Sequence, residues 1–317
     1  MIIDLPSTTT AAVNKAMVEL RESGGAVALG RVLTLVIVTA DGEAEDAIRA
    51  ANDASREHPC RVIVLVKGTR RGGPRLDAQV RVGGDAGASE VIVLRVHGPL
   101  VDHGASVVIP LLLPDAPVVA WWPGEPPPNP VADPIGAMAH RRITDVAACH
   151  DPVRALEDRR ASYVPGDTDL AWSRTTLWRG LLAAALDQPP FERVSQATVA
   201  GGSDSPSTDL LAAWLTAALR VPVTRERTPV GSGLVSVTLT RPGAPIDLVR
   251  PDGHVATLSV AGAPDRRIAL PRRSTSESLA EELRRLDPDE IYALALTKGL
   301  PRLARRAARA AASGAPA

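Results

Sequence analysis

The sequence predicts an α/β protein with two α/β domains, the first on a mainly parallel or mixed sheet and the second on a more antiparallel sheet. Three observations predict this class. The chain has 317 residues, enough for two ordinary domains. In the first half, continuous apolar, β-branched runs alternate with helical patterns, as expected for strands covered on both faces. In the second half, several short strand patterns follow one another.

The first domain begins with a predicted helix, which Ser7 or Thr8 can cap and which Gly24-Gly25 ends. Its apolar face consists of Val13, Ala16, Met17 and Leu20. Residues 32–40, 42–59 and 60–68 then have the patterns of a strand, a helix and a strand. They form a β-α-β unit whose crossover should be right-handed.

Residues 76–84 and 89–98 predict two more strands, with a glycine-rich turn at 83–89 between them. Apolar and polar residues alternate in the first of these strands, which indicates an edge position or one wet face. Residues 102–115 predict a short helix that Pro110 kinks or shortens. Residues 116–124 predict the last strand of this domain.

A proline-rich stretch at 124–134 predicts a boundary or a stiff surface loop. After a connecting region, a helix is expected from about Asp169, then a strand at 193–201 and a helix at 210–219. Further strands are expected at 234–241, 245–251, 254–260 and 266–271, with a turn at 250–253. The resulting domains are 1–125, a boundary and connecting region at 126–165, 166–300, and an Arg/Ala-rich tail at 301–317.

The C-terminal helices carry the clearest start signals. Residues 274–277, Ser-Thr-Ser-Glu, form a capping box, and a second helix should begin at 287–290 with Pro288 at its first helical position. Gly299 and Pro301 should end that helix. Four arginines of the tail recur at helical spacing, so a helical tail would have one basic face. A solvated, fraying terminus and a surface for a partner or nucleic acid both fit this pattern.

Composition restricts the possible functions. The formal net charge is zero, with 36 basic and 36 acidic residues, so the chain lacks the overall basic footprint of nucleic-acid-binding proteins. The start of the chain has no signal-peptide pattern, and prolines break the longest apolar run, 107–122, which excludes a spanning helix there. Two cysteines make no disulfide framework. We therefore expect a cytoplasmic protein without a membrane partner.

Motifs with a known chemistry are absent from the sequence. It has no G-x-S-x-G elbow, no P-loop and no G-x-G-x-x-G after a strand. His97, Asp102 and His103 lie close together but match no established zinc spacing. We therefore expect no catalytic residue, no metal and no cofactor, although a site assembled from distant residues would be invisible at this level.

The best candidate for an anion site is the strand-to-helix loop that contains Gly201, Gly202, Ser203 and Ser207. Free N–H groups at the helix start could hold a phosphate there. Asp204 and Asp209 flank the same helix end and would repel it. A plain connection in which Ser207 or Thr208 caps the helix explains these residues equally well.

Two adjacent tryptophans, Trp121 and Trp122, end an apolar run in a chain with only 3% aromatic residues. Side chains alternate along a strand, so the two indoles should point to opposite faces. We expect one to close the core and the other to lie towards solvent, the proline turn or another protein. A structural role for both is the alternative.

The stretch from Asp167 to Asp187 contains the pattern D-L-x-W-x-R-x-x-x-W-R. Together with the Trp-Trp-Pro-Gly corner at 121–124 and the closing LAEELRRLDPDEIYALAL, it resembles the glucose-6-phosphate dehydrogenase assembly protein family, OpcA. The resemblance extends from the first strand to about Leu300. It implies a non-catalytic bacterial protein that binds glucose-6-phosphate dehydrogenase, the NADP-dependent entry to the oxidative pentose phosphate pathway, as an assembly factor or allosteric activator.

The resemblance also suggests candidate contacts with the dehydrogenase, because Trp and Arg are the side chains most often found at the energetic centres of interfaces. These candidates are Trp121, Trp122, Trp172, Arg174, Trp178 and Arg179. Cyanobacterial members of the family have a redox-sensitive cysteine pair, but Cys60 and Cys149 do not form a closely spaced C-terminal pair. The rival interpretation is a sugar-phosphate-binding protein or enzyme that uses the Gly201–Ser207 loop.

Overall fold

A computed structural model describes residues 1–23, 32–82 and 90–313 of the chain, and its residues fall into two compact units. Unit 1 consists of Met1–Ala148, Gly166–Thr168 and Ser274–Pro288, and unit 2 of Cys149–Pro165, Asp169–Arg273 and Asp289–Ala317. Each unit therefore draws on segments that are distant in sequence. The domain boundaries proposed from the sequence, with domains at 1–125 and 166–300, stay a prediction.

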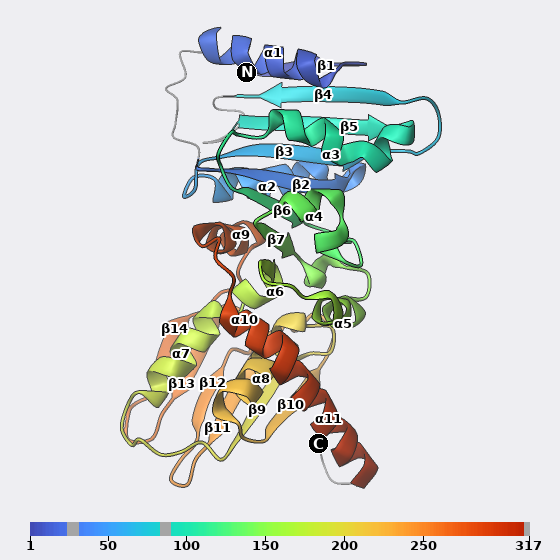
Figure 1. Cartoon of the computed structure of the whole chain (residues 1–317). Helices are drawn as coiled ribbons and strands as arrows, with labels where there is room; N and C mark the ends of the chain where they lie inside the picture. Colours follow the sequence, from blue (N-terminus) through green and yellow to red (C-terminus); the bar gives the residue numbers. More distant parts are fainter. Residues whose placement is uncertain (24–31, 83–89, 314–317) are drawn as a thin grey trace. The chain divides into compact units, whose positions relative to one another are not determined.

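Unit 1 is built on an eight-stranded sheet in the order β1-β4-β5-β3-β2-β6-β7-β8 (Figure 1). Strands β2, β3, β5, β6 and β7 pair with one another in parallel, whereas β4 pairs in antiparallel with both β5 and β1. The predicted mainly parallel or mixed sheet is thus confirmed. The strands are β1 Ile2–Leu5, β2 Leu33–Ala40, β3 Cys60–Lys67, β4 Arg75–Arg81, β5 Glu90–His97, β6 Val118–Trp122, β7 Arg141–Thr144 and β8 Asp167–Asp169.

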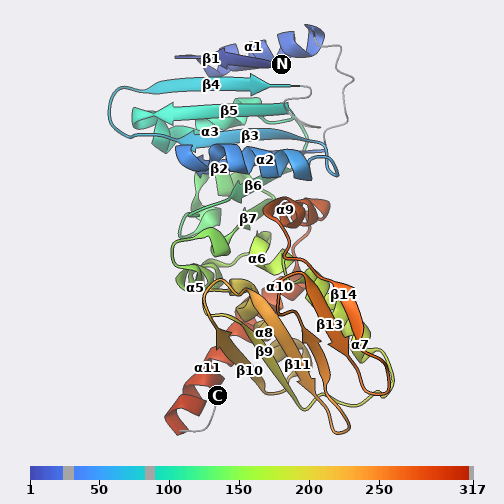
Figure 2. The same ribbon diagram turned by 180° about the vertical axis from the view of Figure 1, so that it is seen from behind.

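Helices cover both faces of this sheet (Figures 1 and 2). Helices α1 (Thr10–Ser23), α3 (Gly104–Val108) and α4 (Pro134–Met138) share one apolar core with alternate residues of the central strands. Helices α2 (Ala44–Ala54) and α9 (Thr275–Arg284) contact each other on the opposite face. Burial on both faces explains the uninterrupted apolar sequences of β2 and β3.

Several details of unit 1 differ from the sequence-based expectation. Helix α1 begins at Thr10, and Thr9 Oγ1 accepts a hydrogen bond from the Ala12 amide at 3.2 Å, so neither Ser7 nor Thr8 caps it. The expected stop at Gly24-Gly25 and the turn at 83–89 lie outside the described residues. Strand β6 is not the last strand, because β7 and β8 extend the sheet beyond it.

Strand β7 escaped prediction because its sequence begins with two arginines, and both are buried. Arg141 forms an ion pair with Glu282 and donates from Nη1 to the Asp287 carbonyl at 2.7 Å. Arg142 forms an ion pair with Asp167 and donates to the Ala139 carbonyl at 2.9 Å. Paired and hydrogen-bonded in this way, charged side chains can occupy a buried strand.

Unit 2 contains a six-stranded sheet in the order β10-β9-β11-β12-β13-β14. Only the β9–β10 pairing is parallel among the described strands of this sheet, so the predicted antiparallel character is confirmed. The strands are β9 Gln196–Gly202, β10 Val223–Thr228, β11 Leu234–Thr240, β12 Ile246–Val249, β13 Val255–Ser259 and β14 Arg266–Ala269. The sequence missed β10 because Arg225, Glu226 and Arg227 interrupt its apolar pattern.

The helices of unit 2 are α5 Pro152–Ser162, α6 Leu170–Ser173, α7 Thr176–Leu186, α8 Pro206–Leu219, α10 Glu290–Leu294 and α11 Leu300–Ser313. Apolar residues of α7, α8 and α11 form one core with the buried face of the sheet. The single helix expected from about Asp169 is divided into α6 and α7. One-sided burial agrees with the alternating pattern of strands such as β13.

The capping box at Ser274 is present, with both of its reciprocal hydrogen bonds. The next helix start differs from the expectation, because Asp289 caps α10 and Pro288 precedes the cap. Gly299 and Pro301 do not end the helix, which continues through a π turn at Ala295–Gly299 into α11. Gly299 allows this path, since a Cβ there would lie 2.1 Å from the Ala213 carbonyl oxygen of α8.

Candidate functional site

The D-L-x-W-x-R-x-x-x-W-R stretch begins with Asp169, whose carboxylate caps α6 by accepting from the Ala171 amide at 2.8 Å. Trp172, three residues after this cap, is buried and 1% exposed. Its indole Nε1 donates to Asp289 Oδ2 at 2.7 Å, and its ring lies against Tyr292 with centroids 5.8 Å apart. Asp289 also caps α10, so one carboxylate connects Trp172 to that helix.

Arg179 completes this cluster. Its guanidinium carbon lies 3.7 Å from the centroid of the Trp172 ring, close enough for a strong cation–π contact. The same side chain donates to Thr175 Oγ1 at 3.0 Å and to Thr176 Oγ1 at 2.9 Å. Trp172 therefore belongs to a buried face of unit 2.

Trp178 lies in the core beneath the sheet of unit 2 and is 1% exposed. The Arg250 guanidinium lies 5.0 Å from its ring centroid and donates to the carbonyls of Leu270 and Leu234. Burial, together with the nearby Arg272 charge, lowers the pKa of Arg250 to about 10. Arg174 is half-buried and stands at the end of α6.

Both indoles of the Trp121-Trp122 pair are inside unit 1, with exposures of 0% and 2%. The predicted opposite directions are found: Trp122 belongs to the core under α1, α3 and α4, whereas Trp121 lines a pocket beside α2. The expectation that one of them lies towards solvent is wrong. Helices cover both faces of β6, so both indoles have a structural role in packing.

The Gly201–Ser207 loop is filled by its own chain. Ser205, and neither Ser207 nor Thr208, caps α8, and its Oγ accepts from the Thr208 amide. A Cβ on Gly201 would lie 2.5 Å from Thr208 Oγ1, and one on Gly202 would lie 2.7 Å from the Asp204 carboxylate. Asp204 in turn accepts from the Gly231 amide at 3.0 Å.

Arg225 contacts both this loop and the helix that follows it. It pairs with Asp209 at 2.7 Å and donates to the carbonyls of Gly201 and Gly202. Burial raises the pKa of Asp209, against the opposing effect of Arg225. With two acids and a hydroxyl at this helix start, the geometry favours a plain strand-to-helix connection over a phosphate site.

A pocket that the sequence did not suggest lies in unit 1 at the carboxyl ends of β2 and β6. Strand β2 lies between β3 and β6, so the connections that leave this point go to opposite sides, and such switch points commonly bind ligands. The pocket measures about 290 Å³, and its charged lining residues are all acidic: Glu43, Asp46 and Asp145. That lining suits a cationic or hydroxyl-rich group and disfavours a phosphate.

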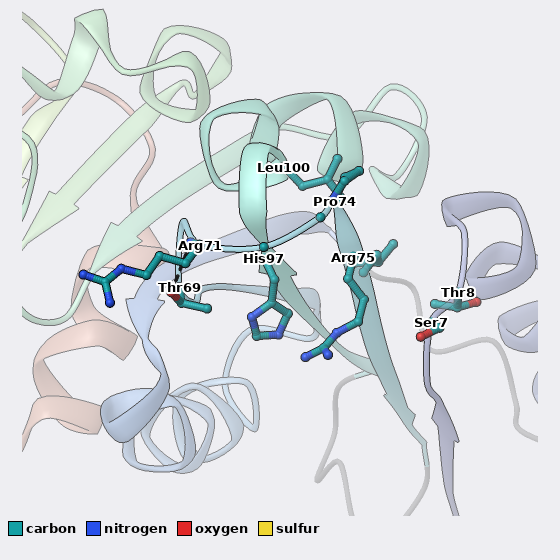
Figure 3. Close-up of a pocket in the computed structure, with 11 residues that line it drawn as sticks. Ser7, Thr8, Thr69, Arg71, Pro74, Arg75, His97 and Leu100 are labelled. Atoms are coloured by element: carbon teal, nitrogen blue, oxygen red, sulfur yellow. Dashed lines mark hydrogen bonds between the residues drawn. The ribbon is translucent and has the colours of Figure 1, made fainter.

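A second pocket of unit 1, about 550 Å³, lies around the Thr69–Pro74 loop (Figure 3). Figure 3 shows Arg75 and His97 side by side, and Arg71 extended away from them. Asp77 lies 3.0 Å from Arg75 Nε and 3.5 Å from His97 Nε2. The Ser7 amide, with the Arg75 and His97 charges, lowers the pKa of Asp77, so a carboxylate already neutralises this corner.

Metal binding finds no support at the histidine-rich segment. Asp102, which lies between the candidate ligands in sequence, pairs with Arg70 at 2.9 Å. Within residues 1–23, 32–82 and 90–313, no group of three or more His, Cys, Asp or Glu side chains is placed to hold a metal ion. Cys60 and Cys149 are both buried, and neither forms a disulfide among these residues. In the same described ranges no helix is long and apolar enough to cross a membrane.

Comparisons with known proteins identify two adjacent family matches along the chain. Residues 51–161 match the model for the N-terminal domain of a glucose-6-phosphate dehydrogenase subunit. Residues 165–296 match the model for the C-terminal domain of the same kind of subunit. A search of curated proteins found no match.

Two solved structures are similar to this chain. One is described as glucose-6-phosphate 1-dehydrogenase from Mycobacterium avium, with 11% identity, a TM-score of 0.46, and coverage of 87% of this chain and 92% of that one. The other is described as an oxidoreductase from Sinorhizobium meliloti, with 9% identity, a TM-score of 0.46, and coverage of 87% and 98%. At these scores we draw no conclusion from the two likenesses.

Proposed function

Because this chain belongs to the glucose-6-phosphate dehydrogenase assembly protein family, OpcA, we propose that it binds glucose-6-phosphate dehydrogenase as a non-catalytic assembly factor or allosteric activator. It would act in the bacterial cytoplasm, at the entry to the oxidative pentose phosphate pathway. The observation that carries the proposal is the pair of family matches, which follow each other in order from residue 51 to residue 296.

The position of the family-like motif is compatible with this role. Its two tryptophans are buried in unit 2 and hold α6, α7 and α10 together, so the motif stabilises a scaffold. Of the six candidate contact residues, Arg174 and Arg179 are half-buried, and Arg179 lies over Trp172. Arg174, at the end of α6, is the candidate that we expect to touch the partner directly.

The experiment compares the initial rate of the purified dehydrogenase with and without a stoichiometric amount of this chain. An activator raises kcat or lowers the KM for glucose 6-phosphate at a constant oligomeric state. An assembly factor shifts the dehydrogenase to a larger oligomer in analytical ultracentrifugation. The chain alone, freed of contaminating dehydrogenase, should not reduce NADP⁺.

Two results would overturn the proposal. One is turnover by the chain alone, and the other is the absence of any effect on rate, oligomeric state or sedimentation of the dehydrogenase. The role of Arg174 is tested by Arg174→Ala, with Arg193→Ala as the matched control, because Arg193 is an exposed arginine of the same unit. We expect Arg174→Ala alone to weaken binding, and melting temperatures show whether both variants are folded.

A further inference from the structure

A groove in unit 2 lies between the carboxyl end of α8, the start of β10 and the continuous helix formed by α10, the π turn and α11. Figures 1 and 2 both show α11 running beside α8 and β10, and the three elements are in contact. The groove measures about 660 Å³. Apart from Thr216, its uncharged lining residues are aliphatic and form what we call the floor: Ala217, Val221, Pro222, Val223, Leu294 and Leu303.

The groove is also lined by four cations, which we call its rim, and by no acid: Arg220, Lys298, Arg302 and Arg306. All four side chains are exposed. Among the residues that the structure describes, none of the four forms an ion pair, whereas Arg225 of the same unit is neutralised by Asp209. The groove therefore concentrates positive charge in a chain whose formal net charge is zero.

Folding alone does not account for this arrangement. Arg220 follows the last residue of α8, where the helix dipole favours a cation. The other three cations have no comparable stabilising role in the fold. Lys298, Arg302 and Arg306 stand four residues apart along one helix, where like charges destabilise the helix. Gly299 fixes their position, since its contact with the Ala213 carbonyl holds the helix against α8.

The spacing indicates the shape of the occupant. Three cations at i, i+4 and i+8 cover about 12 Å of helix, which is longer than a single phosphate can span. The lining residues include no aromatic ring on which a nucleic-acid base could stack, and an overall basic footprint is missing. A peptide with acidic residues for the rim and apolar residues for the floor fits both features.

We propose that this groove binds an acidic, apolar-containing segment of a partner protein, and that the partner is the dehydrogenase. The second half of this statement rests on the proposed function, but the first half does not. Charge complementarity at such an exposed rim acts chiefly on association and register, so binding should weaken as salt rises.

The test uses the full chain and two charge-matched double variants. Lys298→Glu/Arg302→Glu reverses two groove cations, and Arg193→Glu/Arg305→Glu reverses two exposed arginines of the same unit outside the groove lining. The probe is a fluorescein-labelled twelve-residue peptide of alternating Glu and Leu, followed by anisotropy. Melting temperatures confirm that both variants are folded.

We expect the peptide to bind the wild-type chain and the control variant alike, and the groove variant about tenfold more weakly, since each reversed rim charge removes a modest attraction and adds a repulsion. No binding by the wild-type chain, equal binding by the groove variant, or tighter binding of a twelve-nucleotide oligothymidylate overturns the groove as a peptide site.

The same three proteins are then titrated with the dehydrogenase. Selective loss in the groove variant supports the groove as the docking site of this partner. Equal binding by all three overturns that assignment and leaves the proposed function intact. Peptide binding without any dehydrogenase binding overturns the proposed function and the choice of partner, and the groove stands as an acidic-segment site.

Discussion

Replacing single tryptophans by phenylalanine should have very different effects at Trp122 and Trp172, although both indoles are buried. The chemical change is the same, and so is the void of roughly 40 Å³ left behind. At about 24 cal/mol per Å³, that void costs about 1 kcal/mol at either position. The difference must therefore come from what each indole N–H does.

The Trp172 N–H donates to Asp289 at 2.7 Å, and Arg179 lies over the ring at 3.7 Å. A hydrogen bond to a charged group contributes about 1.5–3 kcal/mol, and a phenyl ring binds the guanidinium less well than an indole. Trp172→Phe should thus cost about 3–5 kcal/mol of the free energy of unfolding of unit 2.

The Trp122 N–H is buried and makes no hydrogen bond among the described residues. Removing an unsatisfied buried donor recovers about 1–3 kcal/mol, which offsets the void. Trp122→Phe should therefore leave the free energy of unfolding of unit 1 unchanged or raise it by up to about 2 kcal/mol. Trp121→Phe is the matched control, since the Trp121 N–H is also buried and without a hydrogen bond there.

The assay is urea unfolding followed by tryptophan fluorescence and far-UV circular dichroism, with a separate transition fitted for each unit. Trp121 still reports on unit 1 in Trp122→Phe, and Trp178 reports on unit 2 in Trp172→Phe. The reasoning is refuted if Trp122→Phe costs as much as Trp172→Phe, because the state of the N–H group would then not decide the outcome.

Three further predictions concern buried charge, pH and thiols. Glu90→Gln should cost unit 1 about 3–5 kcal/mol, because the 2.9 Å pair of Glu90 with Arg61 is 1% and 6% exposed, whereas Arg61→Met/Glu90→Leu should recover most of the loss in urea unfolding. Because burial raises the pKa of Asp209 above its unfolded value near 4, the folded state binds more protons between the two values, and unit 2 should lose stability as the pH rises through this window. A pH series that keeps this slope in Asp209→Asn would contradict the assignment. Because both thiols are buried, any effect of the native chain on the dehydrogenase should be equal under oxidising and reducing conditions. The double variant Cys60→Ala/Cys149→Ala should behave in the same way. A redox response that only the native chain shows would refute this prediction.

The sequence predicted the parallel core of unit 1 because strands buried on both faces have a continuous apolar pattern, as in β2 and β3. It could not predict β7, since Arg141 and Arg142 look like surface residues until their partners are known. Glu282 and Asp167 are 141 and 25 residues away from them in the chain. The local sequence pattern of a strand contains no information about ion-pair partners that lie so far away in the chain.

The candidate site shows the same limit. Alternation along a strand predicted the opposite directions of Trp121 and Trp122, but not the helices that cover both faces. Glycine at 299 is a common helix stop, and only its close approach to the Ala213 carbonyl explains why the helix continues. Only the basic face of the tail helix could be foreseen. The groove as a whole could not, because Arg220, which follows α8, is distant in sequence from Lys298, Arg302 and Arg306.

The chain order of unit 1 has a consequence for its biosynthesis. Helix α9 belongs to unit 1, yet it follows the whole Asp169–Arg273 segment of unit 2. During synthesis on the ribosome, roughly ten seconds of elongation separate Arg141 from its ion-pair partner, Glu282. During that interval the nascent sheet holds a guanidinium that is destined for burial but still lacks its counter-charge. Completion of the first unit is thereby delayed until most of the second, up to Arg273, has been translated, and a chain arrested before Ser274 would expose that unfinished sheet to chaperones and proteases.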